Sequence, residues 1–160
     1  MKCNFSVLCI SAVLFFLFSC ESGIKKDFTS GLKITNNGLS FTESYINVDG
    51  KKSTGSEFPL NSVVELHFEG VNGFTLENDM VFLGASMTLV DSKNTEILHY
   101  PDLFADYDST GVSPIDAKLI YLSLSTASPM EAGEKYMWKT RVWDKKGKGE
   151  INTEMEISVK

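Results

Sequence analysis

The sequence predicts an all-β domain, folded as a single antiparallel β-sandwich. Along residues 31–160, short segments in which apolar and polar residues alternate are separated by turn-forming residues. No stretch carries the apolar spacing of an amphipathic helix. Because the side chains of a strand point alternately to its two faces, each such segment buries one face and exposes the other. Seven or eight alternating segments without helices are typical of two sheets packed face to face.

The first two predicted strands cover residues 32–34 and 39–48. Between them, residues 36–38 (Asn-Asn-Gly) form a turn signal, because Asn-Gly pairs are typical of hairpins. Residues 49–56 are polar and glycine-containing, which predicts a loop that ends near Pro59.

The clearest strands follow in the middle of the chain. Residues 63–69 and 81–89 each place every second residue, an apolar one, on a single face. Residues 91–94 predict a hairpin turn into a strand at 95–100. Residues 118–125 are more continuously apolar, which predicts a central strand that is buried on both sides.

The last forty residues predict a hairpin. Residues 135–144 alternate, with Trp138 inward and Trp143 on the opposite face, and residues 145–149 make a tight glycine-containing turn. The inward residues of the final strand are Ile151, Thr153, Met155, Ile157 and Val159. This strict alternation predicts an antiparallel strand with one wet face.

The closing pattern resembles the final hairpin of immunoglobulin-like domains of lipoproteins. It is carried by residues 133–136 (Gly-Glu-Lys-Tyr), residues 142–144 (Val-Trp-Asp) and the last strand. The resemblance implies an immunoglobulin-like sandwich. C2-like and transthyretin-like sandwiches present the same pattern and stay open as alternatives.

The amino-terminal segment resembles the signal peptide of a bacterial lipoprotein. An apolar run of about fourteen residues follows Lys2 and closes on a lipobox-like stretch, residues 17–20 (Leu-Phe-Ser-Cys). The run is too short for a membrane-spanning helix, which needs roughly 20 residues. The resemblance implies cleavage before Cys20 and a lipid on its thiol. An ordinary secretory signal with a coincidental cysteine is the alternative.

This resemblance divides the chain into a signal peptide (1–19), a lipidated tether (20–30) and a β-sandwich domain (31–160). It places the protein in the cell envelope, held through Cys20 at the outer membrane. The phenylalanine-rich apolar run is similar to those of lipoproteins from the Bacteroidota lineage. Without other cysteines in the mature chain, the core alone must stabilise the domain.

Charge excludes nucleic acid as a partner. After removal of residues 1–19, the chain carries 14 basic and 21 acidic residues, a net charge of −7. Residues 57–116 hold Lys93 against eleven acidic residues, a local net charge of −10. Phosphate binding needs a basic face, and this chain has none of the required density. The acidic middle is either a solvated surface or a face for a cation or a basic partner.

The long loop at residues 100–116 is a candidate calcium site. Asp106, Asp108 and the following Thr-Gly resemble the first half of an EF-hand loop, in which alternate oxygens surround a hard cation. The position that needs a bidentate glutamate holds Ala117, so Asp102 or Asp116 would have to complete the site. An ordinary solvated loop is the alternative.

Three residues are candidate contacts with a partner. Trp143 and Arg141 lie outside the predicted core row, and tryptophan beside arginine is typical of interaction hot spots. Phe104 lies in the acidic loop and either packs on the domain or contacts a partner. Trp143 is also a candidate for stacking on a sugar ring.

Motifs for catalysis are absent from the sequence. His67 and His99 stand outside zinc-type spacing, and no nucleophile elbow or nucleotide-binding glycine loop is present. We therefore expect a non-catalytic binding or assembly module that needs no cofactor. Its expected partner is another envelope protein, and its expected role is that of the lipoprotein subunit of an envelope complex. A calcium- or glycan-binding module is the second hypothesis. A small hydrolase with paired carboxylates is the third.

Overall fold

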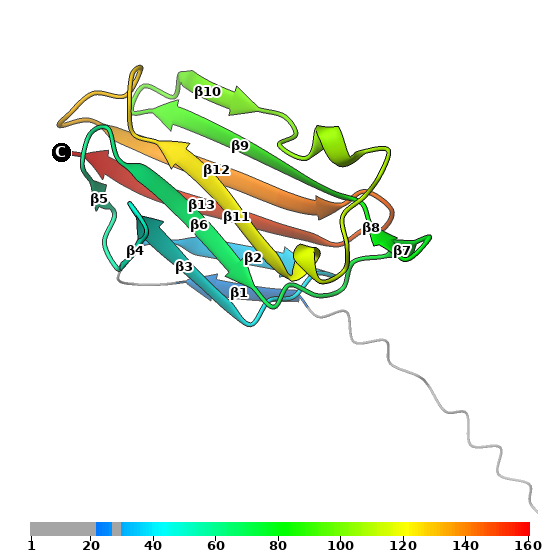
Figure 1. The fold of residues 1–160 in the computed structure, drawn as a ribbon. Helices are drawn as coiled ribbons and strands as arrows, with labels where there is room; N and C mark the ends of the chain where they lie inside the picture. The colour runs from blue at the N-terminus through cyan, green and yellow to red at the C-terminus, as the bar shows by residue number, and fades with distance from the viewer. Residues whose placement is uncertain (1–21, 27–29) are drawn as a thin grey trace, which may run out of the picture.

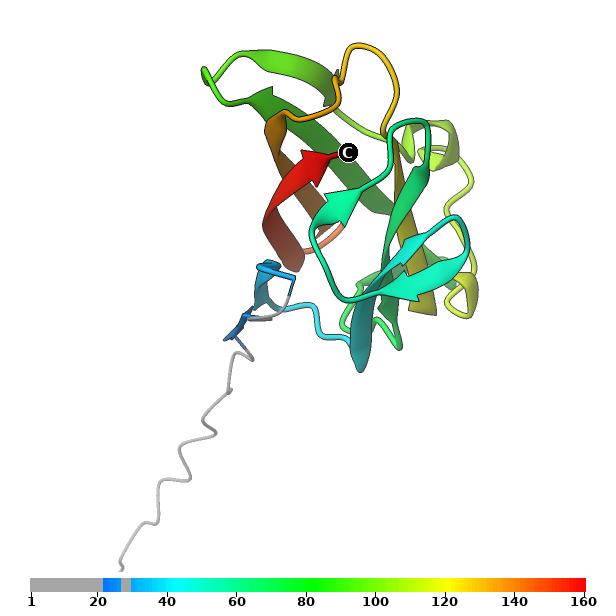
Figure 2. The ribbon, with the colours of Figure 1, turned by 90° about the vertical axis from the view of Figure 1, so that its left-hand side faces the viewer.

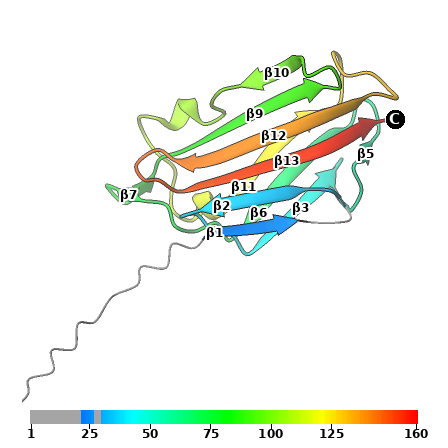
Figure 3. The same ribbon diagram turned by 180° about the vertical axis from the view of Figure 1, so that it is seen from behind.

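The computed structural model describes residues 22–26 and 30–160, and these residues form two packed β-sheets (Figure 1). The larger sheet has seven strands, antiparallel except where β5 pairs with β13 in parallel. Figure 3 shows this sheet from behind, with β1 at one edge and β10 at the other. Its strands in spatial order are β1 (Ser22–Lys26), β2 (Lys33–Asn37), β13 (Glu150–Val159), β12 (Lys135–Asp144), β9 (Leu83–Asp91) and β10 (Glu96–Tyr100), with β5 (Glu57–Phe58) beside β13.

The smaller sheet has four antiparallel strands, with β11 at one edge and β4 at the other. Its strands in spatial order are β11 (Leu119–Ser125), β6 (Val63–Glu69), β3 (Glu43–Val48) and β4 (Lys51–Ser53). A separate two-stranded sheet and two 3-10 helices complete the described part: β7 (Leu76–Glu77), β8 (Met80–Val81), η1 (Ala105–Tyr107) and η2 (Asp116–Lys118). The predicted β-sandwich is therefore confirmed.

The core lies between the two sheets, which face each other in Figure 2. Each of the long strands contributes every second residue to it, as the alternation predicts. Trp138, Phe58 and Phe68 are among the largest fully buried side chains. The inward rows of the closing hairpin and of β6 are buried as predicted, and the 91–94 turn joins β9 to β10.

Two details of the predicted strands are wrong. Residues 36–38 do not close a hairpin, because β2 belongs to the seven-stranded sheet and β3 to the other. The chain instead crosses between sheets after Gly38, whose φ of 72° is the left-handed conformation that glycine favours. The segment 118–125 is not a central strand: among the described strands, β11 pairs with β6 alone, and its residues alternate between exposed and buried.

The segment assigned to the tether contains a strand. Ser22–Lys26 forms β1, which pairs along its whole length with β2. Cys20 and the signal peptide lie outside the described residues. Within the part that the structure describes, no helix is long and apolar enough to span a bilayer.

Candidate functional site

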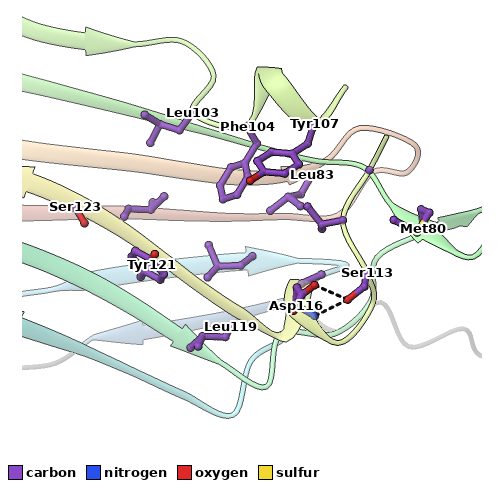
Figure 4. A pocket seen from close by; sticks show the side chains of 15 residues that line it. Met80, Leu83, Leu103, Phe104, Tyr107, Ser113, Asp116, Leu119, Tyr121 and Ser123 are labelled. Carbon is purple, nitrogen blue, oxygen red and sulfur yellow. Dashed lines mark hydrogen bonds between the residues drawn. The ribbon is translucent and has the colours of Figure 1, made fainter. Parts of the chain in front are cut away.

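A groove of about 700 Å³ lies between β11 and the loop that joins β10 to β11. Figure 4 shows its two walls: Leu103, Phe104 and Tyr107 come from the loop, and Leu119 and Tyr121 come from β11. Its remaining lining residues are Met80, Leu83, Gly111, Val112, Ser113, Asp116, Ala117, Ile120, Leu122 and Ser123. The lining is therefore mainly apolar and aromatic, as in sites that bind apolar side chains.

Exposed apolar side chains gather around this groove. Ten large hydrophobic residues of the described part are exposed, and four of them line the groove. These four are Leu103, Tyr107, Leu119 and Tyr121. Scattered exposed hydrophobic residues are ordinary, whereas a cluster beside a groove is typical of an interaction surface.

The backbone of β11 offers a free edge to the groove side. At one end of the strand the Thr126 N–H donates to the Ser62 carbonyl, and at the other the Lys118 carbonyl accepts from Val71 N–H. Because bonded residues alternate along an antiparallel ladder, the even-numbered residues face β6. The N–H and C=O groups of Tyr121, Ser123 and Ser125 therefore point away from the sheet, and no other described residue bonds to them. The Leu119 N–H is not free, because at the end of η2 it donates to the Asp116 carbonyl.

The loop that forms the other wall is fixed by Asp102. One carboxylate oxygen of Asp102 accepts from the Phe104 amide at 2.9 Å and the Ala85 amide at 3.3 Å, and the other lies 2.6 Å from Lys145 Nζ. Burial opposes the charged carboxylate, but Lys145 and the two amides outweigh it and hold the pKa of Asp102 below its usual range. Asp108 also pairs with the Lys145 ammonium.

The four aspartates of the calcium hypothesis do not converge. Lys145 lies between Asp102 and Asp108, Asp106 is exposed, and Asp116 accepts a hydrogen bond of 2.7 Å from the Ser113 hydroxyl. In residues 22–26 and 30–160, no three His, Cys, Asp or Glu side chains are arranged to hold a metal ion. The acidic residues of the loop thus contribute to its folding through a lysine ammonium and a hydroxyl.

An aromatic ladder lies on the outer face of the four-stranded sheet, beside the groove. Tyr45, His67 and Tyr121 stand directly opposite one another on β3, β6 and β11. The His67 ring stacks on Tyr45 with centroids 4.9 Å apart and on Tyr121 with centroids 5.6 Å apart. The sequence places His67 on a polar face, but only the register of the strands shows that two tyrosines flank it.

Carboxylates and one lysine surround the ladder. The Tyr45 hydroxyl donates to Glu69 at 2.6 Å, and this bond, together with burial and the nearby carboxylate charges, raises the pKa of Tyr45 to about 12. Lys52 Nζ lies 3.9 Å from the centre of the Tyr45 ring. Glu65 lies 3.1 Å from His67 Nε2. The ladder is thus bounded by a cation at its β4 end.

The three predicted contact residues do not form one site. Phe104 lines the groove and packs near Tyr107, with ring centroids 6.1 Å apart. Trp143 instead lies over Gly84 on the seven-stranded sheet, half-buried, with the Arg141 guanidinium 5.2 Å from its ring centre. Arg141 is engaged by Glu150 at 2.8 Å. The Trp143 surface is therefore separate from the groove.

The groove itself offers little for acid–base chemistry. Asp116 is the one carboxylate among its described lining residues; it begins η2 and accepts a hydrogen bond from the Ser113 hydroxyl. Two carboxyl groups on opposite sides of a cleft are needed for hydrolysis of the glycosidase type.

No family model matches this chain, and no curated protein sequence matches it.

Proposed function

We propose that this protein is a lipid-anchored binding module of the cell envelope that holds an extended segment of another envelope protein against β11. The segment would add to the four-stranded sheet as a further strand and place alternate side chains in the groove. The observation that carries this proposal is the free edge of β11, whose outward side chains are apolar or uncharged. In this role the chain is a binding subunit without catalytic activity.

Edge strands are usually protected against such pairing. Natural sheets shield an exposed edge with charged side chains, proline or a bulge, because unpaired N–H and C=O groups recruit other strands. The outward row of β11 consists of Leu119, Tyr121, Ser123 and Ser125. It carries no charge and no proline, so β11 is suited to strand addition, in which backbone bonds give affinity and pockets give specificity.

The anchor in this proposal comes from the sequence alone. A lipid on Cys20 would hold the domain at the outer membrane, a few residues from β1. Tethering raises the local concentration of the domain relative to a membrane partner, so a modest affinity of the groove suffices for stable association. The acidic composition of the chain is consistent with a protein partner and disfavours nucleic acid.

Photo-crosslinking in intact cells tests the proposal. A photoreactive phenylalanine analogue replaces Leu119 or Ser123 in the full chain, and the control position is Lys139, an exposed residue on the other sheet. Crosslinked peptides are then identified by mass spectrometry. A Cys20→Ala version, with intact mass measured beside the native chain, tests the contribution of the anchor.

The proposal predicts crosslinks from both β11 positions to one contiguous segment of one envelope protein. Since Leu119 and Ser123 are four residues apart, the two attachment sites on the partner should also lie about four residues apart. Crosslinks from Lys139 alone, or from β11 to many unrelated proteins, would contradict strand addition. A native chain without lipid would contradict the anchor.

A further inference from the structure

We infer that the segment bound at β11 presents an arginine side chain to Tyr121. This inference rests on the proposed function, because it names the chemistry of the segment that β11 would bind. The observations that carry it are the open end of the aromatic ladder, the cation at its other end and the carboxylates on either side.

The ladder is built at the spacing of the strands. Its two ring-to-ring distances, 4.9 and 5.6 Å, are close to the separation of about 4.8 Å between neighbouring strands. A strand added beyond β11 would therefore place the residue opposite Tyr121 one further step along the same row. Tyr121 is 55% exposed, and His67 is the one described residue whose ring or cation contacts its ring.

The other end of the ladder shows what completes such a row. Lys52, on β4, places its ammonium 3.9 Å from the centre of the Tyr45 ring and 2.7 Å from a Glu43 carboxylate oxygen. A cation is attracted to the negative face of an aromatic ring, and the carboxylate holds it there. The open face of the Tyr121 ring, with carboxylates nearby, offers the same pairing of ring and carboxylate to a cation of the bound segment.

Carboxylates accompany the ladder up to β11. In the row on one side of it, Glu65 stands opposite Ser123 and accepts a bond of 3.4 Å from the Ser123 hydroxyl. In the row on the other side, Glu69 stands opposite Leu119. β6 and β11 carry no lysine or arginine, and the histidine of β6, His67, lies 3.1 Å from Glu65. A cation placed beside Tyr121 is therefore attracted by the two carboxylates of β6 and meets no lysine or arginine on these two strands.

The geometry favours arginine over other residues. A guanidinium is planar and stacks flat on a tyrosine ring while its edge N–H groups bond to carboxylates, whereas an ammonium is a compact, strongly hydrated charge. An aromatic residue would continue the stack but would bring no charge to balance the carboxylates of Glu65 and Glu69. An arginine side chain would both stack on the Tyr121 ring and bring a positive charge toward Glu65 and Glu69.

A titration with two defined peptides tests the inference. The probe is the capped heptapeptide Thr-Val-Thr-Arg-Thr-Val-Thr, and its control replaces arginine with citrulline, which keeps the shape and removes the charge. Each is added to the ¹⁵N-labelled full chain in detergent micelles, and amide shifts along β11 give site and affinity. Tyr121→Leu removes the ring, and Tyr100→Leu is the matched control, because Tyr100 is similarly exposed at 47% but does not line the groove.

We expect the arginine peptide to bind at β11 about tenfold more tightly than the citrulline peptide. Tyr121→Leu should abolish this preference, and Tyr100→Leu should leave it unchanged. Equal binding of both peptides at β11, or a preference that survives Tyr121→Leu, overturns the arginine inference and leaves strand addition standing. If neither peptide shifts the β11 amides at millimolar concentration, or if sedimentation shows that a second copy of the chain occupies this edge, strand addition fails as well.

Discussion

The hairpin β12–β13 and the strand β11 share the same alternating pattern but differ in what their outward residues do. On the hairpin these residues are largely charged and paired across strands: Lys135 with Glu156, and Arg141 with Glu150. On β11 they are uncharged, and half of them are large apolar residues. Within the part of the chain that the structure describes, the hairpin has neighbouring strands on both sides, whereas β11 has a neighbour on one side.

This difference assigns the stability of the fold mainly to the β12–β13 hairpin and binding to the outward side of β11. The hairpin lies inside the seven-stranded sheet, where β12 pairs along its length with β13 and β9 and where its inward residues belong to the core. The outward side of β11 lacks the charges that usually protect an edge strand. We therefore expect substitutions in the hairpin to change the free energy of unfolding, and outward substitutions on β11 to change binding.

The largest contrast should come from Trp138 and Tyr121. Trp138→Ala removes a large side chain that is 2% exposed, and we expect it to lower the free energy of unfolding by about 3–5 kcal/mol. Tyr121→Ala should lower it by less than about 1 kcal/mol, because Tyr121 is mostly exposed. Urea denaturation of the two variants measures both values. Similar losses would contradict the division between hairpin and edge.

Gly84 tests whether Trp143 belongs to the folded sheet or to a free surface. A Cβ at this position would lie 2.3 Å from the Trp143 ring, so Gly84→Ala should cost about 1–3 kcal/mol by displacing the indole. In a Trp143→Ala background the same change should cost much less. A double-mutant cycle measures this coupling, and additive losses would show that the indole does not pack on Gly84.

Lys145 should hold the outer wall of the groove. Lys145→Met keeps the aliphatic stem but leaves Asp102 without its cation, and we expect a loss of about 1–2 kcal/mol. The matched control is Lys146→Met, which removes a more exposed pair with Glu77. Hydrogen exchange should increase in residues 102–112 for Lys145→Met and remain unchanged in β12. Faster exchange in β12 would show that the lysine supports the whole sandwich.

The contact between Asp102 and Lys145 also predicts that part of the free energy of unfolding is lost in acid. Because the pKa of Asp102 is lowered in the folded chain, its contribution is present above the unfolded pKa of about 3.9 and is lost as pH falls through the folded value. The difference in unfolding free energy between wild type and Asp102→Asn should therefore shrink below about pH 4. Asp106→Asn, at an exposed position in the same loop, is the control. A difference independent of pH would contradict this assignment.

Alternation in the sequence predicted which side of each strand faces the core. The rows beginning at Val64 and Ile151 are buried as expected, because a one-residue error would turn every apolar side chain toward water. Alternation does not state which strands are neighbours. The apolar character of residues 118–125 predicts a central strand, but two of its apolar side chains are exposed at an edge. The turn signal at residues 36–38 predicts a hairpin where the chain instead changes sheets.

The candidate site depends on the same nonlocal information. Phe104 and the acidic loop stand out in the sequence, but the groove requires β11 to be an edge and the loop to lie beside it. The aromatic ladder joins residues that are up to 76 positions apart, Tyr45 and Tyr121, through strand register. Likewise, the aspartates of the loop resemble a calcium motif, and only the fold places Lys145 between two of them.

Hydrogen exchange along β11, resolved at single amides, tests the free edge most directly. In the purified chain we expect slow exchange at Ile120, Leu122 and Leu124 and fast exchange at Tyr121, Ser123 and Ser125. Consecutive amides in the middle of β12 should all exchange slowly. Binding of an extended segment should then slow the amides of Tyr121, Ser123 and Ser125. Uniformly slow exchange along β11 in the isolated monomer would contradict the account, because the edge would already be occupied.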